Sequence, residues 1–586
     1  MGRASLSAWT WQDGAVWAAV VLLIAYSVLR PISVALGAGD IGPDDPFDDI
    51  MRLMQVRDWM GGQSWFDTDQ NRLGVEGTRM HWSRLVDVPI AALALLIEPF
   101  AGRERALLLA ATVWPPMLGG VFVAVLAAAG RSFGGTVGLL VGAVGGAVIV
   151  TQLTVFIPGR IDHHNWQMIL LALAATALVA PTGRAHVLGA AAGAAVALSI
   201  AIGTETLVFC AVLCAYPAID WAWTGAPKRA AGFGAALAAA MVVLFFVSIP
   251  PARYGLADCD QISVIHVLAA VVGGGGLFLL ARFATGRGRW TRLAALLALG
   301  VVAVGLLAAS APHCLANPLD GLPEPVTEFW LSEVAEAKGF ADADGNVPLN
   351  LALTFGTCLV AAALLIWSLC VQRSAGLLLL LVLVAGAAAF TIYQIRYTSV
   401  LWAFSALSLV VVLSRFAARE RTRAAAALAV LAAFIVHPMQ LAFPVGMLVL
   451  SAEDGETYET DTALEPCDYD RAAAELGGGQ PLFVMAPFNA GPTILMDTPH
   501  RVLASNYHRG AEDIARHIDI ATSPPDQAVT KLQRFGVERV VHCAYHAAIY
   551  AERAPDGLHA ALSRGEPVAG LTLLWEDGAR VYAVER

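Results

Sequence analysis

The sequence predicts a mainly α-helical, polytopic membrane protein that carries a small α/β domain after its last span. Hydrophobic residues make up 57% of the 586 positions and charged residues 14%, whereas soluble domains average about 45–50% and about 25%. Apolar runs long enough to cross a bilayer recur up to residue 450 and then stop. We therefore expect a transmembrane domain over residues 1–451 and an outer domain over residues 452–586. The net charge of −10 argues against a nucleic-acid partner.

Thirteen apolar segments meet the length requirement for a membrane-spanning helix, which is about 20 residues. They lie near residues 15–36, 105–129, 136–157, 165–181, 186–203, 205–222, 230–250, 262–281, 293–311, 351–371, 375–393, 397–413 and 424–450. The run at residues 88–100 is apolar but short, so we expect it to form a re-entrant or interfacial helix.

The basic residues predict the orientation of these spans, because cytoplasmic loops are enriched in Lys and Arg. With the N-terminus inside, the cytoplasmic loops contain Arg131, Arg184, Lys228, Arg229, Arg282, Arg287, Arg289, Arg292, Arg373, Arg415, Arg419, Arg421 and Arg423. Counting residues 88–100 as a span would move all of these outside. The odd number of spans then places the domain 452–586 and the large loops 37–104 and 312–350 on the outer face. We interpret this face as the periplasmic side of a bacterial inner membrane.

The cysteines divide in agreement with this topology. Two pairs lie on the outer side, whereas the remaining four lie in predicted helices and are interpreted as small apolar packing residues. We predict the disulfides Cys259–Cys314 and Cys467–Cys543, because disulfides persist in oxidising compartments such as a periplasm. Four free outer thiols are the alternative.

The first outer loop opens with PDDPFDDIMRLMQVRDWMGG, in which four carboxylates fall within six positions. The apolar residues that follow recur at helical spacing. Acids at the start of a helix are stabilised by the helix dipole, so a cap is one interpretation. Four acids exceed what a cap requires, and Asp48 is therefore a candidate for chemistry.

Between the third and fourth predicted spans the chain reads FIPGRIDHHNWQ. Asp162 and His164 lie directly before a helix, at the outer edge of the membrane. A carboxylate and an imidazole two positions apart are able to ligate one divalent cation. A helix cap followed by two interfacial histidines is the alternative.

Two further segments bring charged residues to the same face. The loop PEPVTEFWLSEVAEAKGF contains Glu333 among other acids, either in a solvated amphipathic helix or in a third acidic cluster. The segment AFTIYQIRYTSV places Arg396 at the outer end of the eleventh span, where it either extends to the interface or binds a lipid phosphate. Glu205, in the turn GTET, is a further acid at this level. The convergence suits metal-assisted transfer of a group from a lipid-phosphate donor.

These motifs resemble those of oligosaccharyltransferase catalytic subunits, integral membrane glycosyltransferases of the GT-C type with a C-terminal outer domain. Their first outer loop carries an Asp followed nine positions later by Arg, as Asp48 and Arg57 do here, with Asp49 as the alternative register. Their D-H-H motif before the fourth span is matched by GRIDHHNW. The resemblance implies a set of roles: metal ligands Asp48, Asp162 and His164 for Mg²⁺ or Mn²⁺, a Glu of the fifth outer loop at Glu333, and a donor-phosphate ligand at Arg396.

The outer domain departs from that family. The W-W-D-Y-G motif, which binds the Ser or Thr of the acceptor sequon, is missing, and the chain reads VMAPFNAGPTILMDTPHRVLASNYHRG where it would fall. We expect this polar segment to bind the acceptor or cover the active site through His500, Tyr507, His508 and Arg509; an ordinary surface turn is the alternative. The runs PLFVMA, RVLAS, RVVHCA, LTLLWE and RVYAVE alternate with helical stretches, which predicts an α/β domain.

The expected function is therefore metal-dependent transfer of a sugar from a polyprenyl-phosphate or -pyrophosphate donor at the periplasmic face. The acceptor would be a glycan, lipid or protein of the cell envelope. A protein oligosaccharyltransferase with non-standard acceptor recognition is one alternative. A transporter or flippase of lipid-linked sugars is another, although transporters usually place their functional charges near the bilayer midplane.

Overall fold

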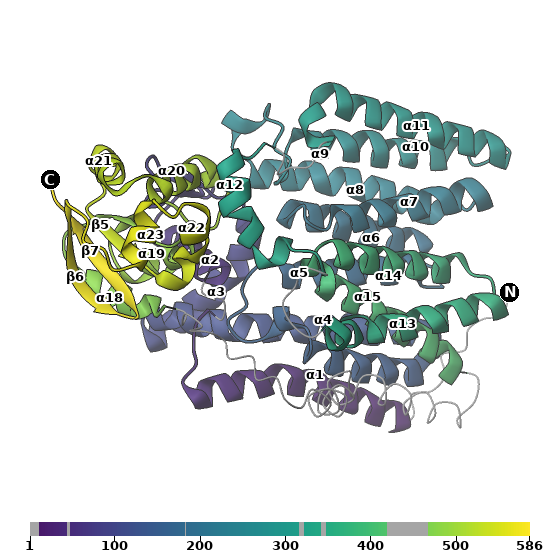
Figure 1. The fold of residues 1–586 in the computed structure, drawn as a ribbon. Helices are drawn as coiled ribbons and strands as arrows, with labels where there is room; N and C mark the ends of the chain where they lie inside the picture. The colour runs from purple at the N-terminus through teal and green to yellow at the C-terminus, as the bar shows by residue number, and fades with distance from the viewer. Residues whose placement is uncertain (1–10, 44–46, 182, 316–320, 341–346, 419–466) are drawn as a thin grey trace. The chain divides into compact units, whose positions relative to one another are not determined.

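The computed structural model describes residues 11–43, 47–181, 183–315, 321–340, 347–418 and 467–586 (Figure 1). The chain forms two compact units. The first comprises residues 1–42, 83–316 and 339–454, and the second comprises residues 43–82, 317–338 and 455–586. The second unit thus combines two loop segments, 43–82 and 317–338, with the C-terminal α/β domain.

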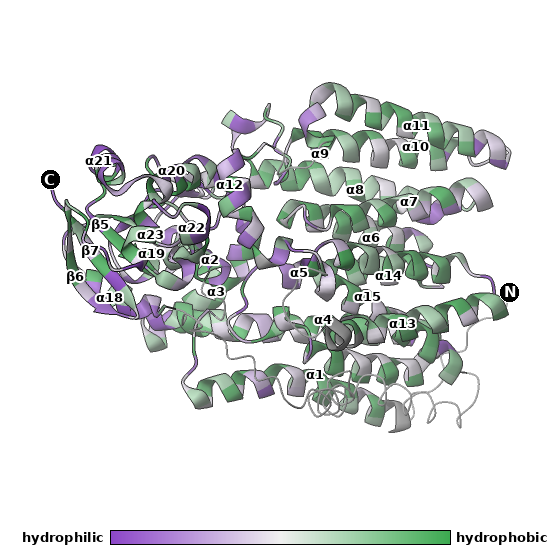
Figure 2. Ribbon diagram, viewed as in Figure 1, coloured by the Kyte–Doolittle hydropathy of each residue, from purple (hydrophilic) through white to green (hydrophobic). Residues whose placement is uncertain are grey.

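The first unit is built from long apolar helices that are stacked side by side (Figure 1) and are dominated by hydrophobic residues (Figure 2). Ten described helices are long and apolar enough to cross a membrane. The helices of this unit are α1 (Trp11–Ala38), α3 (Arg84–Ala101), α4 (Arg103–Val150), α5 (His164–Val179), α6 (Ala185–Ile202), α7 (Leu207–Thr224), α8 (Pro227–Ser248), α9 (Val264–Ala269), η3 (Ala270–Gly275), α10 (Gly276–Phe283), α11 (Arg289–Ser310), α13 (Val347–Val371), α14 (Ala375–Tyr393) and α15 (Thr398–Ala417).

Helix α4 accounts for two of the predicted spans. Its 48 residues contain a break at Gly135, whose φ of 59° lies in the left-handed region that favours glycine. The halves on either side pack closely, since a Cβ at Gly130 would collide with the carbonyl of Gly138. The run of residues 136–150 therefore returns along the preceding helix as a separate segment.

Three other predictions about the spans have distinct outcomes. The segment expected at 165–181 forms the shorter apolar helix α5, of 16 residues. The run at 88–100 forms part of α3, which is not among the ten candidate spans of the described chain. The segment 424–450 lies outside the described residues, so the total of thirteen spans stays a prediction.

The second unit contains the predicted α/β domain. Its five-stranded sheet has the order β4-β3-β5-β7-β6, in which β4, β3 and β5 are parallel and β7 and β6 form an antiparallel hairpin. The strands are β3 (Phe483–Met485), β4 (Arg501–Val502), β5 (Arg539–His542), β6 (Leu571–Asp577) and β7 (Ala579–Val584), and each overlaps one of the expected runs. The helices are α18 (Tyr469–Leu476), α19 (Gly491–Asp497), α20 (Ala511–Thr522), α21 (Pro525–Phe535), α22 (Ala544–Arg553) and α23 (Leu558–Ser563).

The two loop segments of the second unit pack on opposite faces of this sheet. Successive strand residues point to opposite faces, so Met485 and Val484 belong to different apolar clusters. Helix α12 (Glu324–Phe329) adds Val326 to the cluster of Met485. Helix α2 (Asp48–Met60) adds Met51 to the cluster of Val484. The sheet therefore needs both loops to bury its apolar faces.

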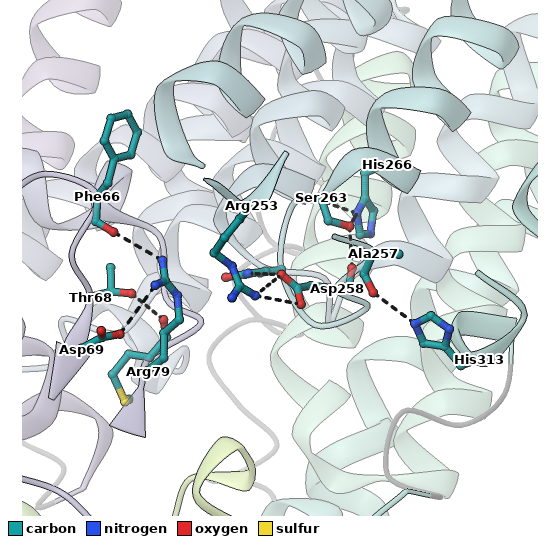
Figure 3. Close-up of polar contacts among 12 residues, drawn as sticks. Phe66, Thr68, Asp69, Arg79, Arg253, Ala257, Asp258, Ser263, His266 and His313 are labelled. Carbon is teal, nitrogen blue, oxygen red and sulfur yellow. Dashed lines mark hydrogen bonds and ion pairs between the residues drawn. The ribbon is translucent and has the colours of Figure 1, made fainter. Parts of the chain in front are cut away.

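A small hairpin follows α2 in the second unit. Strands β1 (Asp69–Gln70) and β2 (Thr78–Arg79) pair antiparallel. Arg79 lies 3.7 Å from a carboxylate oxygen of Asp69, and the Thr68 hydroxyl donates to the Met80 carbonyl at 2.9 Å; Figure 3 draws these contacts.

Both predicted disulfides are present. Cys259–Cys314 lies in the first unit with a Cα–Cα distance of 5.3 Å, and Cys467–Cys543 lies in the second with 6.1 Å. In the loop around the first disulfide, Arg253 donates to both oxygens of Asp258 at 3.1 and 2.8 Å (Figure 3).

Candidate metal centre and its surroundings

The D-H-H motif lies where α5 begins. The chain turns at Gly159, with a φ of 89°, and enters the helix at His164. Asp162 is only 7% exposed and His163 only 4%. A buried carboxylate just ahead of a helix is favoured by the positive end of the helix dipole, but burial is costly without further partners.

The partners are the two histidines of the motif. Asp162 Oδ1 lies 2.6 Å from His163 Nδ1, and Asp162 Oδ2 lies 3.3 Å from His164 Nε2. The two imidazole rings are 4.5 Å apart between centroids. Ligand atoms of the three residues all lie within 4.8 Å of one another, which is close enough to share one cation.

Glu205 completes this cluster from the turn between α6 and α7. Its Oε1 lies 3.2 Å from His163 Nε2, and its Oε2 accepts a hydrogen bond of 2.9 Å from Gln167 Nε2. Gln167 also pairs through Oε1 with His164 Nδ1 at 3.0 Å. The sequence predicted Glu205 only as a further acid at the same face of the membrane. It gave no reason to single out Gln167, because the partners of Gln167 are determined by helix packing.

The electrostatics of the cluster couple His163 to Glu205. Burial by itself would lower the pKa of His163, but the carboxylates of Asp162 and Glu205 outweigh it and raise the pKa to about 10. Burial would raise the pKa of Glu205, but His163 and then His164 hold it well below its usual range. The two carboxylates therefore favour the protonated form of His163, and a protonated imidazole has no lone pair to offer a metal.

The geometry of Asp162 and His164 fits a divalent cation. Metal–oxygen and metal–nitrogen bonds of about 2.1 Å, at a right angle, separate two ligand atoms by about 3 Å. Asp162 Oδ2 and His164 Nε2 are 3.3 Å apart. The pair therefore needs only a small adjustment to hold one ion.

Arg396 belongs to the same unit. It is exposed and lies in the short helix η8 (Ile395–Tyr397), directly before α15. Its neighbour Tyr397 donates through its hydroxyl to the main-chain oxygen of Glu205 at 3.3 Å. This contact connects the segment that carries the arginine to the turn that carries Glu205.

Asp48 belongs to the second unit, where it is the first residue of α2 and is partly exposed. Asp49, the alternative register, is completely buried. Arg57, nine positions after Asp48, donates from Nη1 to the Met496 carbonyl at 2.9 Å. The motif's arginine therefore binds the C-terminal end of helix α19.

Glu333 also belongs to the second unit. It ends the short helix η5 (Leu331–Glu333), its side chain is 52% exposed, and Lys338 Nζ lies 4.0 Å from one of its oxygens. The preceding Trp330 is 7% exposed and donates from Nε1 to Asn506 Oδ1 at 2.9 Å. The glutamate is therefore presented at the surface by a loop with a buried anchor.

The four candidates of the outer domain have different surroundings. His500 is completely buried, with its Nδ1 accepting from Leu482 N and its Nε2 3.1 Å from the Leu476 carbonyl, and its role toward an acceptor stays a prediction. Tyr507 is 4% exposed and donates to the Phe47 carbonyl. His508 and Arg509 are partly exposed.

Comparisons with known proteins bear on the fold. No model of a protein family matches the sequence, and no curated protein sequence does either. The structure is similar to that of the oligosaccharyltransferase of Archaeoglobus fulgidus in the apo form, with a TM-score of 0.65 and 15% identity over 97% of this chain and 74% of that one.

Two further structures are also similar. The same archaeal enzyme, AglB, in complex with an inhibitory peptide and a dolichol-phosphate has a TM-score of 0.64 at 15% identity, covering 97% of this chain and 74% of that one. Arabinofuranosyltransferase AftD from Mycobacteria has a TM-score of 0.49 at 17% identity, covering 97% of this chain and 40% of that one. The archaeal enzyme's structures have also been determined with zinc and sulfate, and with a tethered acceptor peptide. The chain thus has the fold of an oligosaccharyltransferase, a GT-C membrane glycosyltransferase fold.

Proposed function

We propose that the chain is a metal-dependent membrane glycosyltransferase whose donor is a sugar linked to a polyprenyl phosphate or pyrophosphate. The observation that carries the proposal is the pairing of Asp162 Oδ2 with His164 Nε2 at 3.3 Å, in a buried cluster that precedes a membrane helix. The fold shared with an oligosaccharyltransferase, and that enzyme's complex with dolichol-phosphate, support a lipid-linked donor.

In this proposal Asp162 and His164 hold Mg²⁺ or Mn²⁺ together with Asp48 from the second unit. A bound divalent cation would supply Lewis-acid stabilisation of the donor's phosphate. Arg396, exposed at the outer end of its helix, binds the same phosphate and offsets the charge that develops there. The acceptor attacks the anomeric carbon, the bond from that carbon to the phosphate oxygen breaks, and the phosphate leaves with the electron pair. The acceptor's proton passes to a base or to solvent.

The acceptor is proposed as a glycan or lipid of the cell envelope. The segment APFNAGPT replaces the W-W-D-Y-G motif of protein oligosaccharyltransferases. Protein glycosylation with non-standard recognition is the second candidate, and it is favoured by the archaeal enzyme's structure with a tethered acceptor peptide. Glu333, on its anchored loop, is proposed either to approach the metal or to orient the acceptor. Tyr507, His508 and Arg509 stay candidates for the acceptor side.

The location is proposed to be the outer face of a bacterial inner membrane. Two disulfides support an oxidising compartment for the loop of Cys259 and for the second unit. Alternating access in a transporter usually works around charges near the midplane. Here the buried acid–histidine cluster lies at the junctions between helices, directly before α5 and between α6 and α7.

The test is sugar transfer by the purified full chain, with radiolabelled sugars on polyprenyl phosphate and on polyprenyl pyrophosphate as two parallel donors. Asp162→Asn removes a ligand charge at nearly constant volume and is expected to lower transfer at least about 100-fold. Asp519→Asn, at an exposed acid paired with Lys531, is the matched control and is expected to retain full activity. Unchanged transfer by Asp162→Asn, or movement of donor across vesicles without transfer, would overturn the proposal.

A further inference from the structure

Glu205 contacts two different side chains of the acid–histidine cluster, His163 and Gln167. One carboxylate oxygen faces His163 and the other accepts from Gln167. We propose that Gln167 and Glu205 are positioning residues that determine which atoms of His164 and Asp162 face the bound divalent cation. This inference rests on the proposed function, because it assigns the residues that orient its metal ligands.

The hydrogen bonds of Gln167 to Glu205 and His164 determine the tautomer of His164. An amide has one acceptor end and one donor end. The Nε2 end of Gln167 faces two acceptors, Glu205 Oε2 at 2.9 Å and the Gly203 carbonyl at 3.4 Å. Its Oε1 end must therefore accept from His164 Nδ1, which lies 3.0 Å away. The hydrogen on Nδ1 makes Nε2 the nitrogen with the lone pair, and Nε2 is the atom beside Asp162.

His163, which contacts Glu205, fixes the orientation of the Asp162 carboxylate. His163 lies between Asp162 Oδ1 at 2.6 Å and Glu205 Oε1 at 3.2 Å. The second contact is an ion pair when His163 is protonated. Since Oδ1 is held by the imidazole, rotation of the carboxylate is restricted and Oδ2 stays beside His164 Nε2.

The main chain next to Glu205 allows its contacts with both Gln167 and His163. A Cβ added at Gly203 would lie 2.4 Å from Glu205 Oε2, 2.9 Å from Gln167 Nε2 and 2.9 Å from His163 Cδ2. Only a residue without a side chain allows the three groups to close over this position. The Glu205 carbonyl in turn accepts from the Tyr397 hydroxyl. The turn is therefore shaped to hold the carboxylate between Gln167 and His163.

Partners of this kind affect metal affinity without touching the metal. Histidine ligands commonly donate their second ring nitrogen to an acceptor, and loss of that acceptor typically lowers affinity by about 10–100-fold. Gln167→Met keeps the length of the side chain and removes its hydrogen bonds to His164, Glu205 and the Gly203 carbonyl. We expect it to raise the dissociation constant for Mn²⁺ by about 10–100-fold.

The experiment is a titration of the purified full chain with Mn²⁺ alone, followed by electron paramagnetic resonance of the free ion. Asn165→Ala is the matched control, because Asn165 lies on the same helical turn and bonds the Arg160 carbonyl instead of the cluster. Its affinity for Mn²⁺ is expected to match that of the wild type. Thermal unfolding of each variant shows whether it is folded.

An exchange of the two groups tests positioning against simple packing. The double variant Gln167→Glu/Glu205→Gln keeps an acceptor toward His164 Nδ1 and reverses the donor and acceptor between positions 167 and 205. Its affinity for Mn²⁺ is expected to recover at least tenfold relative to Gln167→Met. Wild-type affinity in folded Gln167→Met, or no recovery in the folded exchange variant, would overturn the inference while leaving the proposed function in place. If the wild-type chain and Asp162→Asn bind Mn²⁺ equally, the proposed function fails as well.

Discussion

The indole of Trp330 donates a 2.9 Å hydrogen bond to the side-chain oxygen of Asn506, across 176 positions of sequence. Trp330 is 7% exposed and packs in the cluster that includes Met485 of strand β3. Asn506 in turn donates to Asn489. The loop that carries Glu333 is therefore attached to the α/β domain by a buried aromatic side chain with a specific polar contact.

Removal of this contact should loosen the loop. Trp330→Phe keeps an aromatic ring but leaves the half-buried Asn506 oxygen without its indole donor, which costs at most about 1–3 kcal/mol. We expect faster proteolytic cleavage within residues 321–338 and a lower unfolding temperature of the full chain. Trp575→Phe, in the hairpin strand β6, is the comparison and should leave cleavage of this loop unchanged. Equal cleavage rates in the wild type and Trp330→Phe would contradict the anchoring role.

A second anchor joins the first loop to helix α19. Arg72 donates from Nη2 to the Leu495 carbonyl at 2.5 Å and from Nη1 to the carbonyls of Thr498 and His500 at 2.7 and 3.1 Å. A cation at the C-terminal end of a helix satisfies carbonyls that lack partners and interacts favourably with the dipole. Lysine keeps the charge but not the planar, forked donor. Arg72→Lys is expected to lower the free energy of unfolding by about 1–2 kcal/mol, measured by denaturant titration, and Arg534→Lys, on exposed α21, by less than about 0.5 kcal/mol. Equal losses in the two variants would argue against the cap.

Three buried histidines should make the second unit sensitive to acid. Burial lowers the pKa of His559 to about 4, and burial together with His559 and Arg580 lowers the pKa of His542 to about 2. Burial and His559 also hold the pKa of His517 well below its usual value. Below the ordinary histidine pKa of about 6.5 the unfolded chain binds protons that the folded chain does not, so acid favours unfolding.

The unfolding temperature of the full chain is therefore expected to fall as the pH is lowered from about 6.5 to about 4, whereas above pH 6.5 these three histidines contribute no pH dependence. Differential scanning calorimetry at a series of pH values measures this dependence. In His559→Phe the decrease should be smaller, since this variant removes one titrating group and the neighbour of the other two. A decrease of the same size in His559→Phe would show that other groups cause the acid sensitivity.

The disulfide Cys467–Cys543 should contribute strongly to the second unit. It joins the chain just before α18 to the residue after strand β5, across a separation of 76 residues. Loss of a native disulfide typically costs about 2–5 kcal/mol. The double variant Cys467→Ser/Cys543→Ser is expected to unfold at a lower denaturant concentration, with a free energy of unfolding about 2–5 kcal/mol below that of the wild type. Cys370→Ser, at an exposed free thiol, should unfold as the wild type does. A reducing agent should lower the free energy of unfolding of the second unit in the wild type. It should leave that of the second unit in the double variant unchanged.

The strands and most of the membrane helices were predictable because their signals are local. A bilayer requires long apolar runs, and the five strand-like runs of the outer domain each overlap one strand. Helix α4 was also foreseen as two spans, since Gly135 interrupts it where the apolar run changes. The two disulfides were predicted from the expected topology, and the structure contains both.

The candidate site was only partly predictable. Asp162 and His164 are two positions apart, so the sequence brings them together. The contribution of Gln167 depends on how α5 packs beside the turn of Glu205, a contact that no spacing reveals. His500 was predicted as a binding group because it lies in a polar segment, and only the structure shows that both of its ring nitrogens contact main-chain atoms.

The sequence by itself predicted a membrane protein with an α/β domain, and it predicted the two disulfides that the structure contains. Only the tertiary structure decided that residues 43–82 and 317–338 pack with the α/β domain, and that one carboxylate, Glu205, contacts both His163 and Gln167. The physical reason is the range of the interactions. Burial in a bilayer and strand formation are read from neighbouring residues, whereas loop packing and metal-ligand orientation depend on segments that meet only in the folded chain.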